Sequence, residues 1–100
     1  MVTELYQNLV KVIDEAVRTK NIYAVPEAAE AAGMAGGETH KGFSERWEYS
    51  YEDDAGRSVV VHCRWYDQSQ AFNIRPDKHV MSVELRGPGP MQSHSGSYED

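Results

Sequence analysis

The chain has 100 residues, a length that fits one small domain rather than several. Its formal net charge is −6, from 16 acidic and 10 basic side chains, which argues against nonspecific binding to nucleic acid or to an anionic membrane surface. One cysteine, Cys63, excludes an intramolecular disulfide, and no apolar stretch is long enough for a signal sequence or a membrane span, so we expect a soluble cytoplasmic protein without a membrane partner.

The N-terminal part of the chain predicts two helices. Apolar residues such as Leu5, Leu9 and Ile13 recur at three- and four-residue spacing, which predicts an amphipathic helix over 3–20. A proline suits the first turn of a helix, and the Ala- and Glu-rich segment 26–32 begins with one. This segment is therefore predicted to form a second, shorter helix.

The central part of the chain alternates polar and apolar side chains with the two-residue period of a β-strand. Before it, residues 33–42 contain four glycines and are predicted to form a loop. After it, residues 87–100 are rich in Gly, Pro, Ser and acids, and we expect a flexible, disordered tail there. The alternating part divides into four predicted strands, at about 43–52, 58–66, 70–75 and 79–86.

These elements predict an α+β fold in one domain, residues 1–86. Both helices would pack on one face of a four-stranded antiparallel β-meander in the order 1-2-3-4. Matching inward residues across the strands places Trp47 beside Cys63, Cys63 beside Ile74, and Ile74 beside Met81, beneath the first helix. The two outermost strands are open edges, so a homodimer formed through an edge strand stays open as an alternative.

The same register gathers polar side chains on the outer face of the predicted sheet. One row would hold Arg46, Arg64, Asn73 and Ser82, and the next row Glu48, His62, Arg75 and Val80. Like charges directly opposite one another are unfavourable unless something neutralises them, and a guanidinium group fits carboxylates and phosphates. An ordinary solvated sheet face would also explain the pattern. The residues predicted to bind a partner are Arg46, Glu48, His62, Arg64, Tyr66, Asn73 and Arg75.

No catalytic, metal or nucleotide motif is present in the sequence. His62 beside Glu48 resembles a general base held by a carboxylate, but nothing identifies a nucleophile. The histidines lack metal-ligand spacing, so we expect neither a metal nor a cofactor. The leading hypothesis is a small acidic, non-enzymatic protein-interaction module, such as an inhibitor, an immunity-type protein or an adaptor. The alternative is a small-molecule-binding or enzymatic domain whose pocket, between the first helix and the sheet, is lined by Glu45, Trp47, Tyr49 and Tyr51.

Two further interpretations concern nucleic acid. Residues 24–34 are similar to the first helix and turn of a helix-turn-helix, but the segment that follows is glycine-rich and lacks the basic or amide side chains of a recognition helix. The acidic residues would mimic the phosphates of a nucleic acid only if the fold spaced them regularly. The charge balance therefore favours a protein partner over nucleic acid.

Overall fold

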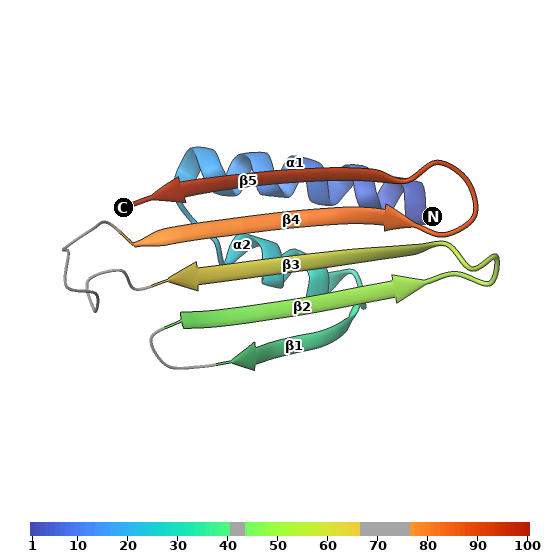
Figure 1. Cartoon of the computed structure of the whole chain (residues 1–100), viewed down its shortest axis with the longest axis horizontal. Helices are drawn as coiled ribbons and strands as arrows, with labels where there is room; N and C mark the ends of the chain where they lie inside the picture. The colour runs from blue at the N-terminus through green and yellow to red at the C-terminus, as the bar shows by residue number, and fades with distance from the viewer. Residues whose placement is uncertain (41–43, 67–76) are drawn as a thin grey trace.

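The computed structural model of the chain describes residues 1–40, 44–66 and 77–100. Two helices pack on one face of a five-stranded antiparallel sheet, which confirms the predicted α+β class. The strands lie in the sheet in chain order, β1-β2-β3-β4-β5 (Figure 1). The elements are α1 (Val2–Thr19), α2 (Ala24–Ala31), β1 (Ala35–His40), β2 (Ser44–Glu52), β3 (Ser58–Tyr66), β4 (Lys78–Arg86) and β5 (Gln92–Glu99).

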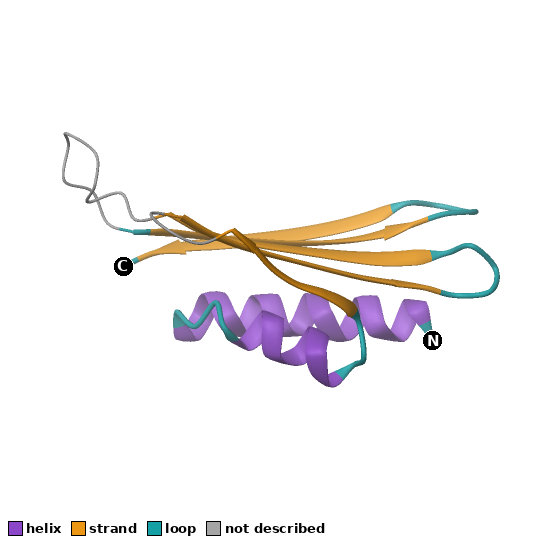
Figure 2. Cartoon of the chain, turned by 90° about the horizontal axis from the view of Figure 1, so that it is seen from below, coloured by secondary structure: helices purple, strands orange, loops and turns teal. Residues whose placement is uncertain are grey.

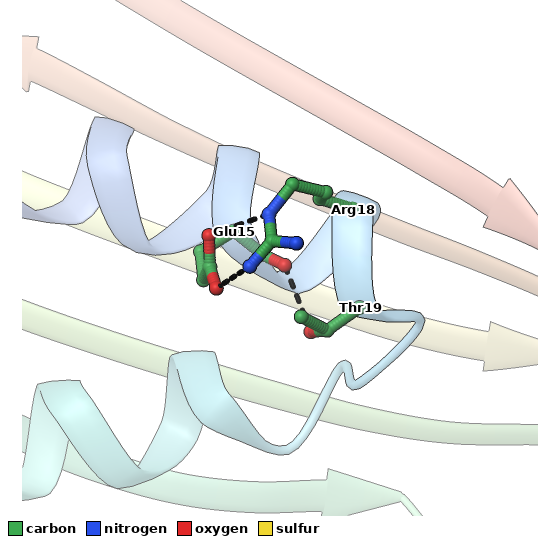
Figure 3. Close-up of polar contacts among 3 residues, drawn as sticks. All are labelled: Glu15, Arg18 and Thr19. Carbon is green, nitrogen blue, oxygen red and sulfur yellow. Dashed lines mark hydrogen bonds and ion pairs between the residues drawn. The ribbon is translucent and has the colours of Figure 1, made fainter.

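Helix α1 forms where the apolar spacing predicts it. Near its C-terminal end, Arg18 donates hydrogen bonds to the Glu15 carboxylate, and the Thr19 hydroxyl donates one to the Glu15 carbonyl oxygen at 2.8 Å (Figure 3). Arg18 lowers the pKa of the Glu15 carboxyl, but both side chains are exposed, so the pair adds little stability. The helix is held mainly by its buried stripe, Val2, Tyr6, Leu9, Ile13 and Ala16.

Helix α2 begins two residues before its predicted start at Pro26, which lies in the first turn. The helix ends in a Schellman motif. Gly33 takes a positive φ of 77°, its N–H donates to the Glu30 carbonyl oxygen, and the Met34 N–H donates to the Ala29 carbonyl oxygen at 3.1 Å. Glycine adopts this left-handed conformation without the steric cost of a Cβ, so the predicted end of the helix is confirmed.

The β2–β3 hairpin has the predicted register. Trp47 pairs with Cys63, and every other pair of the ladder follows from that one. In the connecting turn, Asp53 Oδ1 accepts a hydrogen bond from the Arg57 N–H at 2.9 Å, and Gly56 has a φ of 84°. A positive-φ glycine is typical of the short turns that connect hairpin strands, so this turn fits the two predicted strands that it joins.

Strand β4 was expected to be separated from β3 by a strand at 70–75. That segment lies outside the described residues, but β3 pairs directly with β4, with Cys63 opposite Met81. The predicted neighbours Cys63–Ile74 and Ile74–Met81, and the four-strand order, are therefore wrong. The physical reason is that alternation fixes which face a side chain occupies and does not fix which strands are neighbours.

The prediction of a glycine-rich loop over 33–42 is wrong for Ala35–His40, which form strand β1. The strand pairs with β2, although five of its six residues are exposed. At Gly36, which has a φ of 136°, a Cβ atom would lie only 2.0 Å from the Glu48 carbonyl oxygen. Glycine therefore permits the close approach of the two strands, and a composition typical of a loop forms an edge strand.

The prediction of a disordered tail over 87–100 is wrong for Gln92–Glu99, which form strand β5. Besides its ladder with β4, the strand contacts α1 and the segment after it through three residues. His94 Nε2 lies 2.7 Å from Asp14 Oδ1, and the Tyr98 hydroxyl accepts a hydrogen bond from the Ile22 N–H at 2.8 Å. Gly96 lies directly beneath α1, where a side chain would not fit without a shift. These contacts supply the order that the local composition does not.

Both helices lie on the same side of the sheet, and no helix of the described residues covers the other face (Figure 2). The main contacts of α1 are with β3, β4 and β5, whereas α2 contacts β2 and β3. The first helix was expected to lie over Trp47 on β2, but α2 is the helix packed against that strand. The sheet supplies a buried layer beneath the helices, Trp47, Tyr49, Val59, Val61, Cys63, Met81, Val83 and Leu85.

One buried polar residue was not predicted. His79 on β4 is 6% exposed, and its ring stacks on the Tyr98 ring with centroids 4.3 Å apart. Its Nε2 lies 3.7 Å from an Asp100 carboxylate oxygen, and its Nδ1 is buried with no hydrogen-bond partner among the described residues. His79 thus joins β4 to the end of β5 through its ring.

Candidate functional site

The outer face of the β2–β3 hairpin brings together four of the predicted partner-binding residues. Arg46 lies directly opposite Arg64, and in the adjacent row Glu48 lies opposite His62. Both arginines and Glu48 are exposed, and His62 is half-buried. The alternation of β2 and β3 turns these side chains away from the helices, as predicted.

These four residues line a shallow depression of about 350 Å³ on the outer face. Thr39 from β1 adds a hydroxyl group to its wall, and parts of Trp47 and Cys63 also line it. The depression therefore combines two guanidinium groups, an imidazole, a hydroxyl and one carboxylate in a small space. Such a set can bind a carboxylate through the arginines and a hydrogen-bond donor through Glu48.

The two arginines differ in how they are held. The guanidinium of Arg64 donates a hydrogen bond to the Tyr66 hydroxyl, and its Cζ lies 5.2 Å from the centre of the Tyr66 ring. Tyr66, also predicted to belong to the site, therefore positions Arg64. Arg46 makes no hydrogen bond or ion pair with another described residue. Among the described residues, the guanidinium of Arg64 therefore has a side chain that orients it, and that of Arg46 has none.

The remaining members of the predicted rows differ from expectation. Asn73 and Arg75 lie outside the described residues. Because β3 pairs directly with β4, Val80 lies opposite Arg64 and Ser82 lies opposite His62, the reverse of their predicted rows. The described part of this face therefore carries an apolar and a hydroxyl side chain beside the charged pairs.

A second depression, of about 500 Å³, adjoins the first along β1 and β2. It shares Thr39 and Glu48 with the first depression and extends over Gly36 and Gly37. The sequence prediction missed this part of the surface because residues 33–42 were assigned to a loop. The pair of glycines is the local signal for it, because a strand without side chains leaves a groove over its backbone.

Two residues of the alternative pocket, Trp47 and Tyr49, are packed into the core. The Tyr49 hydroxyl donates a hydrogen bond to Glu30 at 3.1 Å, and the Trp47 ring meets the Tyr23 ring edge-on at 5.7 Å. Burial, and then the hydrogen bond to Glu30, raises the pKa of Tyr49 to about 12. Both aromatic side chains therefore fill space between α2 and β2.

The other two residues of the alternative pocket lie nearer the surface. Glu45 is half-buried opposite Trp65, and its charge adds to burial in raising the pKa of Tyr23. Tyr51 is half-buried and lines a cavity of about 250 Å³ between the helices and β2. The other residues lining this cavity are Met1, Glu4, Leu5, Asn8 and Ala32.

Within residues 1–40, 44–66 and 77–100, no three His, Cys, Asp or Glu side chains are grouped so that they could hold a metal ion. In the same part of the chain, no helix is both long enough and apolar enough to cross a lipid bilayer. A comparison with protein-family models found no matching family, and comparisons with curated proteins and with solved structures found no match either.

Proposed function

We propose that the protein is a small, non-enzymatic protein-interaction module, of the inhibitor, immunity-type or adaptor kind, that binds an acidic segment of a partner protein. The observation that carries this proposal is the juxtaposition of Arg46 and Arg64 across the β2–β3 ladder. Like charges at directly opposite positions destabilise a sheet. The other described members of their row are His40, Val80 and Ser97, none of which supplies a carboxylate. A partner carboxylate would relieve the repulsion between the two guanidinium groups.

A peptide segment fits this surface better than a small inorganic anion does. Glu48 lies in the same depression as the two arginines, so the site offers an acceptor as well as donors. A peptide can present a carboxylate to the arginines and a backbone N–H to Glu48 at once. The volume of about 350 Å³ suits one or two side chains of such a segment. The remainder of the partner would then extend along the groove over β1.

The negative net charge of the chain supports binding of an acidic partner at the arginine pair alone, rather than attraction of acidic molecules to the whole surface. The whole protein carries a formal charge of −6, so the arginine pair is a positive patch on a negative molecule. An acidic partner is repelled elsewhere and attracted only at this patch, which favours one docking orientation. The binding should weaken as salt is added, because the patch is exposed to solvent.

The test is charge reversal at Arg64. Binding of a fluorescein-labelled polyglutamate peptide to the full chain would be measured by fluorescence anisotropy. Charge-assisted hydrogen bonds contribute about 1.5–3 kcal/mol, so R64E should weaken binding and raise the dissociation constant by about tenfold or more. The melting temperature should not fall, because Arg64 is exposed and a glutamate opposite Arg46 replaces a repulsion with an attraction. R18E is the matched control, since it makes the same charge change on α1.

Two results would overturn the proposal. One is that R64E binds the peptide as well as the unsubstituted protein does, and the other is that R18E loses as much binding as R64E. A second measurement compares the proteins that the two variants capture from a lysate of the native cell. We expect the R64E variant to lose partners that the R18E variant retains.

We also place the protein in the cytoplasm as part of this proposal. Cys63 is 1% exposed, and burial raises the pKa of its thiol to about 12. A buried thiol that stays protonated behaves as a small apolar side chain, which suits a compartment where no disulfide is needed.

A second candidate function is small-molecule binding at the cavity beside Tyr51. The cavity of about 250 Å³ is smaller than most ligand sites, but apolar and polar side chains both line it. A thermal-shift screen of metabolites tests this candidate. A ligand that raises the melting temperature of the unsubstituted protein, and does so less for a Tyr51→Ala variant, would support it. If no metabolite shifts the transition, this candidate fails.

A further inference from the structure

We propose that β5 exchanges between two copies of the chain, so that in a dimer each copy's β5 pairs with β4 of the other copy. This inference does not depend on the proposed function, because it concerns β4, β5 and the segment that joins them, whereas the arginine pair lies on β2 and β3. The occupant of the β4 edge is thus the same segment in both states, supplied either by its own chain or by a second copy.

The segment between β4 and β5 is a short hinge that contains two prolines. The five residues 87–91 must reverse the chain, and both glycines there have positive φ, 110° at Gly87 and 99° at Gly89. Pro88 and Pro90 alternate with these glycines, and each proline fixes its own φ near −65°. A short hinge with two prolines favours strand exchange, because proline favours an extended backbone and the open form lets the segment extend.

The neighbouring turn carries a cost when the hinge is closed. The Arg57 side chain packs against the hinge, where its Nη2 donates a hydrogen bond to the Pro90 carbonyl oxygen at 3.2 Å. The Nε of the same side chain is buried and has no hydrogen-bond partner among the described residues. A Cβ on Gly87 would lie 2.5 Å from the Gly56 carbonyl oxygen, so only a glycine at this position lets the closed hinge approach the turn at 53–57. A buried donor without a partner is unfavourable, and opening the hinge relieves it.

The β5 strand of a second copy fits the β4 edge because of its side chains. In one chain, these side chains contact α1, β4 and the segment after α1. The Asp14 carboxylate is hydrogen-bonded to the His94 ring, and the Ile22 N–H donates a hydrogen bond to the Tyr98 hydroxyl. Beneath α1, a side chain at position 96 would not fit without a shift of Val17 or Ile13. All of these partners precede the hinge in the chain. A β5 from a second copy therefore makes the same contacts as the chain's own β5, and another strand would lose them.

Strand β5 is held by its ladder with β4 and by a few specific contacts rather than by aliphatic packing. It contains no aliphatic side chain, and its outward residues are Ser93, Ser95, Ser97 and Glu99. When it detaches, β4 exposes an unpaired edge next to side chains that the closed form buries completely, such as Val83 and Leu85. Helix α1 passes behind β5 (Figure 1), so the side chains of β5 that face the helix keep the same surroundings when the strand comes from a second copy.

The test mixes two variants, Ser82→Cys and Ser95→Cys, each of which has one new cysteine besides the buried Cys63. These residues lie directly opposite each other across the β4–β5 ladder, on the outer face. In closed monomers the two new thiols are on different molecules and remain apart. In an exchanged dimer they face each other, and oxidised glutathione added to the mixture converts them to a disulfide while it is reduced to two glutathione thiols. We expect a covalent heterodimer on non-reducing gels, increasing with the total protein concentration at which the two variants are incubated.

The control is a mixture of Glu52→Cys and Ser58→Cys, which are opposite each other on the β2–β3 ladder and do not exchange in this proposal. Circular dichroism checks that all four variants fold. No heterodimer from the β4–β5 pair at any concentration would overturn the proposal, as would equal cross-linking of the control pair. A dimer detected by light scattering without the Ser82→Cys/Ser95→Cys cross-link would indicate a different interface and would also overturn it.

Discussion

The hydrogen bond between Tyr98 and Ile22 offers a direct test of how β5 is held. Tyr98→Phe removes the acceptor oxygen, which lies 2.8 Å from the Ile22 backbone nitrogen, and keeps the ring that stacks on His79. Ile22 is 1% exposed, so water cannot replace the lost oxygen. A buried donor without a partner costs about 1–3 kcal/mol, and we expect the free energy of unfolding to fall by about 1–2 kcal/mol because the hydroxyl no longer has to be desolvated. For a domain of this size, that corresponds to a melting temperature lower by about 5–15 °C.

Thermal and urea unfolding, followed by tryptophan fluorescence, measure this loss. Trp65 is a suitable reporter because its ring lies 6.3 Å from the His79 ring, next to the end of β5. Tyr66→Phe is the control, since the Tyr66 hydroxyl bonds only to an exposed arginine on the outer face, and its loss should stay within about 0.5 kcal/mol. If Tyr98→Phe were as stable as the control variant, the Ile22 N–H would not depend on Tyr98, and β5 would not be docked as described.

Two further predictions concern packing and pH. Gly96→Val should lower the free energy of unfolding by about 1–3 kcal/mol, because even a Cβ at this position would lie 2.8 Å from Val17 Cγ2. Urea titrations measure this loss, and unchanged stability would show that β5 does not pass beneath α1. Burial raises the pKa of Cys63 from 9.0 to about 12, and burial with a hydrogen bond raises that of Tyr49 from 10.0 to about 12. At pH 9–12 the unfolded chain loses these protons while the folded chain keeps them, so stability should decrease as pH rises through this range. Urea unfolding at stepped pH measures the decrease, which Cys63→Ala should make shallower, and a flat profile for the unsubstituted protein would contradict both pKa shifts.

The elements that the sequence predicted correctly are those whose signals are local. The stripe of α1 repeats over five turns, and the β2–β3 hairpin combines regular alternation with a turn that contains Gly56. Each of these signals depends on residues close together in the chain, so no knowledge of distant contacts is needed. The register of the hairpin follows, and with it the positions of Arg46 opposite Arg64.

Both edge strands were missed because their order depends on distant residues. Gly36 fits against the Glu48 carbonyl group, and Gly96 fits beneath Ile13 and Val17, so in each case a glycine that locally favours a loop permits a close tertiary contact. Tyr98 similarly finds its donor at Ile22, 76 positions earlier in the chain. Composition reports the flexibility of the unfolded segment and contains no information about such a partner.

The centre of the predicted binding surface, Arg46 opposite Arg64, depends only on the β2–β3 hairpin, so the structure keeps it. The residues around this pair depend on the strand order, so they differ from the prediction. With β4 directly beside β3, Val80 and Ser82 adjoin Arg64 and His62, so the described face is less basic than expected. If the proposed function holds, the attraction for an acidic partner comes, within the described part of this face, from one pair of arginines rather than from a broad basic surface. A single arginine substitution should consequently remove most of the electrostatic contribution to binding, and the salt dependence should correspond to one or two ion pairs. A partner that needs many charges for its affinity would not fit this surface.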